Sequence, residues 1–64
     1  MATSTGTELR IAMALRRLSG REVARRVGVS EFRISRILND RQRPDALTLA
    51  RIRAAIYDDA DNAA

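Results

Sequence analysis

The chain has 64 residues and a formal net charge of +4 at neutral pH, and it contains neither cysteine nor histidine. A chain of this length forms one small domain, and the missing residue types exclude disulfide bonds, cysteine or histidine metal sites and histidine-dependent catalysis. We therefore expect a protein that is not an enzyme and needs no metal, cofactor or small-molecule ligand. No apolar run reaches the ~20 residues that span a bilayer, and the first residues lack a secretory-signal pattern. A cytoplasmic protein without membrane contact is expected.

The charge is distributed unevenly along the sequence. All 12 basic residues are arginines, and they lie within residues 1–57 together with five acidic residues, which gives that part a net charge of +7. Residues 58–64 carry three aspartates and are expected to form an acidic, disordered tail. A basic body suits a polyanionic partner, double-stranded DNA first, and an ordinary basic domain is the alternative.

The N-terminal part predicts a flexible start followed by a helix. Residues 1–6 are small and polar without periodicity. The first helix is predicted to begin between residues 6 and 8, with Thr5 or Thr7 as its N-cap, and to continue to about Arg17. One of two apolar stripes should face the core, leaving the other to solvent or a partner. The competing stripes are Leu9, Ala12 and Met13, and Ile11, Ala14, Leu15 and Leu18.

Residues 19–44 carry the strongest local pattern, two short amphipathic helices joined by a tight turn. Ser19 and Glu22 form a predicted capping box, in which each side chain bonds the other residue's backbone N–H. Gly28 ends the first of these helices, because a left-handed residue there has no steric penalty, and Ser30 caps the second. The spacing is typical of a helix-turn-helix motif.

The second helix of the motif is predicted to direct Ile34, Ile37 and Leu38 into the core and to end at Asn39-Asp40. A basic loop follows, and Pro44 forces an extended conformation on the preceding residue. A last helix, capped by Asp45 and ending near Tyr57, completes the pattern. Its predicted inward face contains Leu47, Leu49, Ile52 and Ile56. The remaining arginines of the first two helices, interpreted as a solvated face with some phosphate contact, are Arg16, Arg17, Arg25 and Arg26.

With these motifs in place, the chain resembles the Cro/repressor-type, lambda-repressor-like helix-turn-helix family of phage and bacterial transcriptional regulators. The resemblance extends roughly from Leu9 to Ile56. Its most specific positions are Leu18-Ser19, Glu22-Val23-Ala24, Gly28-Val29-Ser30, Ile34-Ser35-Arg36-Ile37, Asn39, Arg43-Pro44, Thr48-Leu49 and Ile52. It implies an all-α fold, a compact four-helix lambda-repressor-like domain over residues 7–57 with a central helix-turn-helix, a fifth helix being the alternative.

The resemblance implies a sequence-specific regulator that occupies an operator on double-stranded DNA with residues 30–38 in the major groove. A protein–protein adaptor or antirepressor that keeps the fold without reading DNA is the alternative. The implied base-reading residues are Ser30, Glu31, Phe32, Arg33, Ser35 and Arg36. The implied phosphate-binding residues are Ser19, Gly20, Arg21, Asn39, Arg41 and Arg43.

For some of the implied base-reading residues, the residue type indicates one DNA contact, and for others it leaves two roles open. Arg36 matches guanine O6 and N7, and Phe32 matches a thymine methyl group, with folding back onto the motif as the alternative for Phe32. Glu31 suits cytosine N4 or simply the helix N-terminus. Arg33 is either a base reader or a phosphate ligand.

The chain also departs from the family pattern. Gly20 replaces a common glutamine, so Arg21 is expected to supply the lost phosphate contact. Met13 and Leu38 replace a buried Arg–Glu ion pair, and we expect these two side chains to touch. The chain ends before the fifth helix that helps relatives to dimerise, so a monomer that self-associates on DNA and a weak dimer remain open.

Overall fold

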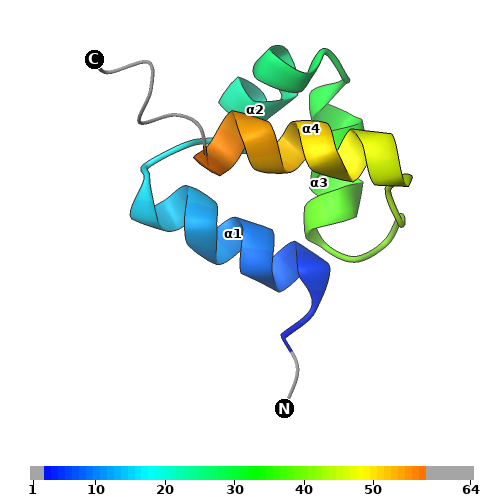
Figure 1. The fold of residues 1–64 in the computed structure, drawn as a ribbon, viewed down its shortest axis with the longest axis horizontal. Helices are drawn as coiled ribbons and strands as arrows, with labels where there is room; N and C mark the ends of the chain where they lie inside the picture. The colour runs from blue at the N-terminus through cyan, green and yellow to red at the C-terminus, as the bar shows by residue number, and fades with distance from the viewer. Residues whose placement is uncertain (1–2, 58–64) are drawn as a thin grey trace.

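The computed structural model describes residues 3–57, which form four α-helices and no β-strand within that range. The helices are α1 (Thr5–Leu15), α2 (Gly20–Val27), α3 (Glu31–Leu38) and α4 (Ala46–Tyr57) (Figure 1). This confirms the predicted all-α fold with a central helix-turn-helix, which consists of α2 and α3. A fifth helix is absent from the described range, and the predicted acidic tail, residues 58–64, lies outside it.

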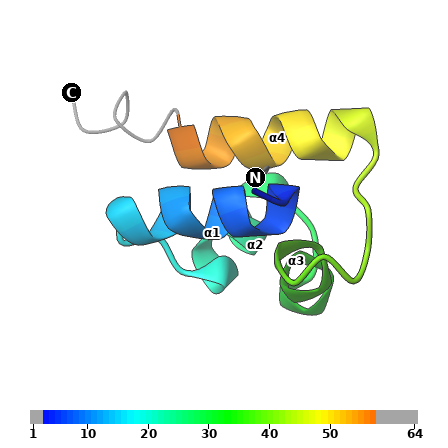
Figure 2. The ribbon, with the colours of Figure 1, turned by 90° about the horizontal axis from the view of Figure 1, so that it is seen from below.

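The helices pack as two pairs around one core. α1 and α4 run in the same direction across the molecule, and α3 lies on the opposite side from α4 in the view of Figure 2. Both α1 and α2 contact both α3 and α4. The side chains that are fully buried between them are Leu9, Val23, Ile34, Ile37, Ile52 and Ile56.

The start of α1 differs from the prediction. The helix begins at Thr5, and Ser4, rather than Thr5 or Thr7, is its N-cap. Its hydroxyl oxygen accepts a hydrogen bond from the Thr7 N–H at 3.2 Å and donates its own proton to Asp40 Oδ2 at 2.7 Å. The contact with Asp40, 36 residues away, favours this cap over the other candidates, and local sequence patterns do not contain it.

Three helices end with a left-handed residue, which is the C-cap itself in α2 and the residue after the C-cap in α1 and α3. α1 ends at Leu15, two residues before the predicted end, because the Leu18 N–H bonds the Met13 carbonyl at 2.9 Å and Arg17 has φ of 56°. This bond pattern is the Schellman motif, which satisfies the last carbonyls of a helix. Gly28 has this role after α2, as predicted, and Asp40 has it after α3.

The apolar faces of α1 and α4 are only partly as predicted. The first stripe of α1 (Leu9, Ala12, Met13) is buried, whereas Ile11 and Leu15 of the second stripe are 54% and 78% exposed. In α4, Ile52 and Ile56 are buried and Leu49 is half-buried. The prediction for Leu47 is wrong, because it lies in the first turn, off the stripe that faces the core, and is 59% exposed.

Met13 and Leu38, which replace the family's buried ion pair, lie in an apolar environment. Met13 and Leu38 are both buried and belong to the same hydrophobic cluster. The cluster contains no charged side chain, so no buried ion pair has to be desolvated at this position. Direct contact between the two side chains stays a prediction.

Candidate nucleic-acid interface

Local interactions within the motif fix α3 on the domain. The Ser30 hydroxyl accepts a hydrogen bond from the Arg33 N–H at 3.1 Å, as expected of an N-cap. Ile34 and Ile37 are about 1% exposed and hold the inner side of the helix in the core. The outer side of α3 is therefore presented to solvent. Of the predicted base-reading residues, those that are exposed are Ser30, Glu31, Phe32, Ser35 and Arg36.

Phe32 and Arg36 form a pair on this outer side. The Phe32 ring is 71% exposed, so it does not fold back into the core. The Arg36 guanidinium carbon lies 5.7 Å from the centre of the ring, which is within the range of a cation–π interaction. Phe32 and Arg36 are one helical turn apart in the sequence of α3, and their side chains lie close together.

Arg33 is placed differently from its neighbours on α3. It is half-buried, and its Nε is buried without a hydrogen-bond partner. The hydroxyl and backbone N–H of Thr48 lower the pKa of Asp45, and the positive charge of Arg33 contributes to the same effect. The base-reading or phosphate-binding role of Arg33 stays a prediction.

Residues from both ends of the motif meet at a shallow groove of about 290 Å³. Among the lining residues are the predicted phosphate-binding residues Ser19, Gly20, Arg21 and Asn39, together with Glu31 and Ser35 of α3. Arg10 of α1 also lines the groove, and the sequence analysis did not identify it. Its position N-terminal to the motif gave no signal, because only packing of α1 against α3 brings it there.

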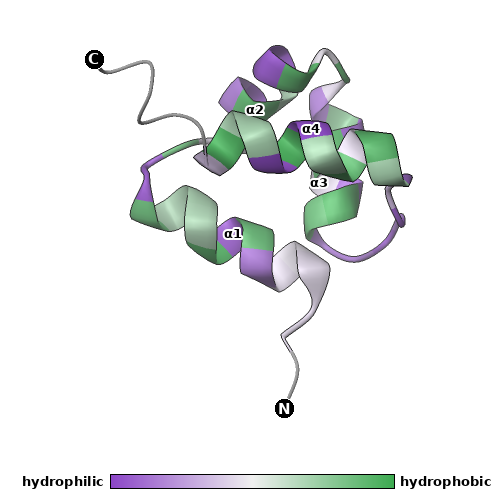
Figure 3. Ribbon diagram, in the orientation of Figure 1, coloured by the Kyte–Doolittle hydropathy of each residue, from purple (hydrophilic) through white to green (hydrophobic). Residues whose placement is uncertain are grey.

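Two of the predicted phosphate-binding side chains already have partners within the domain. The Ser19 hydroxyl accepts from the Glu22 N–H at 3.1 Å, and Asn39 Nδ2 donates to the Ser35 carbonyl at 2.9 Å. Arg21, Arg41 and Arg43 are exposed, and the segment between α3 and α4 that carries the latter two is strongly hydrophilic (Figure 3). None of these three arginines takes part in the ion pairs of residues 3–57.

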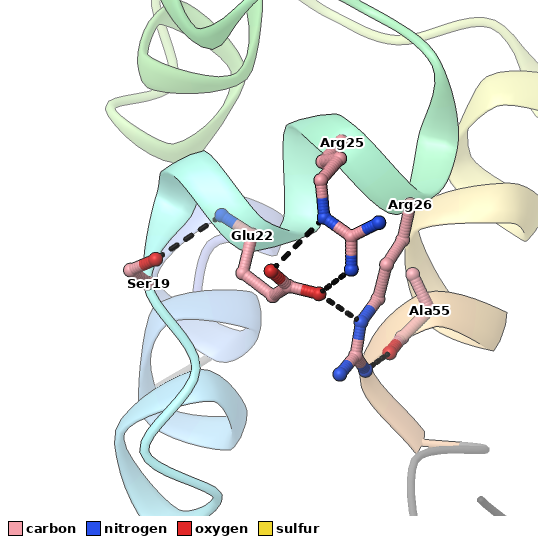
Figure 4. A network of polar contacts seen from close by, with 5 residues as sticks. All are labelled: Ser19, Glu22, Arg25, Arg26 and Ala55. Atoms are coloured by element: carbon pink, nitrogen blue, oxygen red, sulfur yellow. Dashed lines mark hydrogen bonds and ion pairs between the residues drawn. The ribbon is translucent and has the colours of Figure 1, made fainter.

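Glu22 is the centre of a polar network on α2 (Figure 4). Its carboxylate accepts hydrogen bonds from Arg25 and Arg26, and these bonds lower its pKa from 4.5 to about 2. The predicted bond from Glu22 to the Ser19 N–H is not formed within residues 3–57, because both carboxylate oxygens face these arginines. Arg26 Nη1 also donates to the Ala55 carbonyl at 3.2 Å and so ties α2 to α4.

The four arginines interpreted as a solvated face are all exposed, as predicted, and their phosphate contact stays a prediction. Some of them also have partners within the domain. Arg26 joins two helices, and Arg25 is paired with Glu22 although its side chain is largely exposed. Arg16 lies with its guanidinium carbon 4.9 Å from the ring centre of Tyr57 and donates to the Ala12 carbonyl. Arg16, Arg25 and Arg26 therefore also make contacts within the domain.

Asp40 forms the second interaction that sequence reasoning missed. Its two carboxylate oxygens accept hydrogen bonds from the Ser4 hydroxyl at 2.7 Å and the Gly6 N–H at 3.0 Å. These donors lower the pKa of Asp40. We refer to Ser4, Gly6 and Asp40 as the Asp40 clasp. It joins the N-terminus of α1 to the C-terminal end of α3, next to the basic segment.

Two further features were sought in the described part of the chain. No group of three or more acidic, histidine or cysteine side chains in residues 3–57 is arranged to hold a metal ion. The helices of the same range are too short or too polar to cross a membrane.

Comparison with known proteins agrees with the geometry of α2 and α3. A family model described as a helix-turn-helix domain matches residues 5–57. The searches of curated proteins and of solved structures gave no match. Because the model covers most of the chain, the protein belongs to this helix-turn-helix family of DNA-binding domains.

Proposed function

We propose that the protein is a sequence-specific transcriptional regulator of the Cro/repressor type, which occupies an operator on double-stranded DNA. The observation that carries this proposal is the outer face of α3, where Phe32 and Arg36 are exposed and make contact with each other. Side chains in this position of a recognition helix reach base edges in the major groove. The site of action would be the nucleoid in the cytoplasm of a bacterial cell.

The surrounding arginines support a phosphate-binding role. Arg21 precedes α3 in the sequence, and Arg41 and Arg43 follow it, and all three are exposed. Contacts of this kind position a protein on the duplex without reading its sequence. Arg10 joins Arg21 in the same groove and is proposed as an additional phosphate ligand.

A selection from random duplexes at two salt concentrations tests this function. We expect an enriched sequence whose binding weakens steeply with salt, because phosphate contacts release counterions. A palindrome with half-sites about 10 bp apart would reveal two copies on DNA, whereas a single half-site would reveal a monomeric reader. Binding of every duplex alike would contradict sequence-specific reading.

Two variants separate base reading from phosphate binding. Arg36→Ala should cost about 1–3 kcal/mol of binding free energy and relax the preference at one base pair. Arg43→Ala should weaken binding to all sequences similarly and lower the salt slope by about 1. If Arg36→Ala leaves the sequence preference intact, the assignment of the reading face is wrong.

The adaptor function is the second candidate, and one observation favours it. Ile11 and Leu15 are both exposed on α1 and line one surface depression, and contiguous exposed apolar patches mark protein interfaces. An adaptor would show no salt-dependent affinity for DNA. Absence of binding to every duplex at low salt would therefore select this candidate.

A further inference from the structure

Phe32 is a large apolar side chain that the core of the domain does not cover. The inward positions of α3 are occupied by Ile34, Ile37 and Leu38, and all three are buried. The Phe32 ring is left 71% exposed. Apolar surface in water carries a free-energy cost that contact with an apolar group of a ligand would remove. The ring is therefore a candidate contact for an apolar group of the bound DNA.

Arg36 is held against this ring. The two residues are one helical turn apart, and the guanidinium carbon lies 5.7 Å from the ring centre. Arg36 is in none of the ion pairs of residues 3–57, so no carboxylate holds its guanidinium group. Stacking restricts the rotamers of a long side chain before binding, which lowers the entropy lost when it meets a base.

The two side chains match two different groups of the major groove. Guanine offers O6 and N7 to the planar guanidinium fork, and thymine offers its C5 methyl group to an apolar side chain. Successive bases on a strand are about 3.4 Å apart. Because the ring and the guanidinium group are 5.7 Å apart, less than two such steps, they reach neighbouring bases.

On the basis of the DNA-binding function proposed above, we infer that Phe32 and Arg36 act as one composite reader of a two-base step. The step consists of a pyrimidine with a C5 methyl group next to a guanine. Phe32 contacts the methyl group, and Arg36, stacked on Phe32, binds the guanine. Thymine and 5-methylcytosine both carry this methyl group, and the experiment distinguishes them.

Three libraries of random duplexes serve as probes. One contains thymine, one contains uracil in its place, and one contains uracil together with 5-methylcytosine in place of cytosine. The thymine library should enrich a thymine next to a guanine. The uracil library should still enrich the guanine, but it should show no preferred base at the neighbouring position. Enrichment of 5-methylcytosine beside guanine in the third library would identify the methyl group itself as the feature that is read, and enrichment of the thymine step alone would restrict the reader to thymine.

Single substitutions in the enriched duplex measure the contact. Replacing the thymine of the step by uracil should lower the affinity of the wild-type protein about fourfold, the equivalent of about 0.8 kcal/mol for one buried methyl group. Replacing the guanine by 7-deazaguanine should lower it about tenfold or more, because one acceptor of the bidentate contact is lost.

Protein variants test whether the two residues act together. In Phe32→Ala the uracil penalty should disappear, and the guanine discrimination should fall several-fold because the stack is lost. Phe32→Leu should keep the uracil penalty but lower the guanine discrimination, since leucine has no π face. Leu15→Ala is the matched control, because it truncates an exposed apolar residue on α1 and should leave DNA binding unchanged. Thermal unfolding verifies that every variant is folded.

The possible failures are distinguishable. If the wild-type protein selects a specific sequence but no thymine-to-uracil exchange lowers its affinity, the composite reader is wrong and the regulator function stands. The same holds if Phe32→Ala retains the full guanine discrimination. If the wild-type protein enriches no sequence at all, the proposed function fails, and the composite reader fails with it.

Discussion

Replacing Gly6 by alanine should destabilise the protein, although the same change stabilises most helices. Gly6 is buried in the first turn of α1, where its N–H donates to Asp40. A Cβ atom at this position would lie 2.8 Å from Asp40 Oδ1 and closer still to the Leu38 carbonyl oxygen. The latter is backbone, so α1 and α3 would have to move apart.

Two opposing terms determine the size of the effect. Alanine is favoured over glycine in a helix by about 1 kcal/mol. Overpacking of a tight site costs about 1–3 kcal/mol, and a clash with a backbone atom falls in the upper half of this range, about 2–3 kcal/mol. We therefore expect Gly6→Ala to lower the free energy of unfolding by about 1–2 kcal/mol, out of a total of about 3–10 kcal/mol for a domain of this size. The melting temperature should fall by roughly 4–8 °C for each kcal/mol.

Gly20→Ala is the matched control. A Cβ atom at Gly20 would lie 3.8 Å from Ile34 Cγ2 and 3.9 Å from Leu38 Cδ1, which are ordinary van der Waals distances. This variant should be more stable than the wild type by about 0.5–1 kcal/mol. Urea unfolding monitored by far-UV circular dichroism measures both. A Gly6→Ala protein as stable as the wild type would refute the close approach of α1 and α3.

Two further predictions concern the clasp and the core. The donors Ser4 and Gly6 lower the pKa of Asp40, so the stabilisation is complete above its unfolded-state value of 3.8 and is lost as the pH falls through the folded-state value. Asp40→Asn should reduce this acid sensitivity in pH-dependent unfolding, and the titration of Glu22 should be unchanged. Met13→Val and Leu38→Val should each cost about 1 kcal/mol, and a double-mutant cycle should show coupling above about 0.5 kcal/mol, whereas additive effects would mean that the side chains do not touch.

Local sequence signals predicted the motif itself well. Ser19 and Ser30 accept from the backbone N–H groups three residues on, and Gly28 is left-handed, as their residue types indicate. These features depend on interactions within a few residues, which a sequence pattern contains. The exposure of Phe32 also followed from the occupied inward positions of its helix.

The differences arise where distant parts of the chain meet. Asp40 selects Ser4 as the cap of α1, and Arg26 reaches the Ala55 carbonyl on α4. Arg17 ends α1 in a left-handed conformation without being the glycine or asparagine that would have signalled it. The roles of the arginines depended on such contacts, because the same residue type binds a carboxylate, a ring or a carbonyl according to its position.

The arrangement of these contacts separates stability from recognition in α3. Its inner face is held by Ile34 and Ile37, and its C-terminal end by Asp40. On the outer face, Phe32 and Arg36 contact each other and lie outside the core. Exposed substitutions of this kind change the free energy of unfolding by less than about 0.5 kcal/mol. Changes to the outer face should therefore alter DNA binding at constant stability, whereas changes to Gly6 should alter stability first and binding only through the population of folded protein.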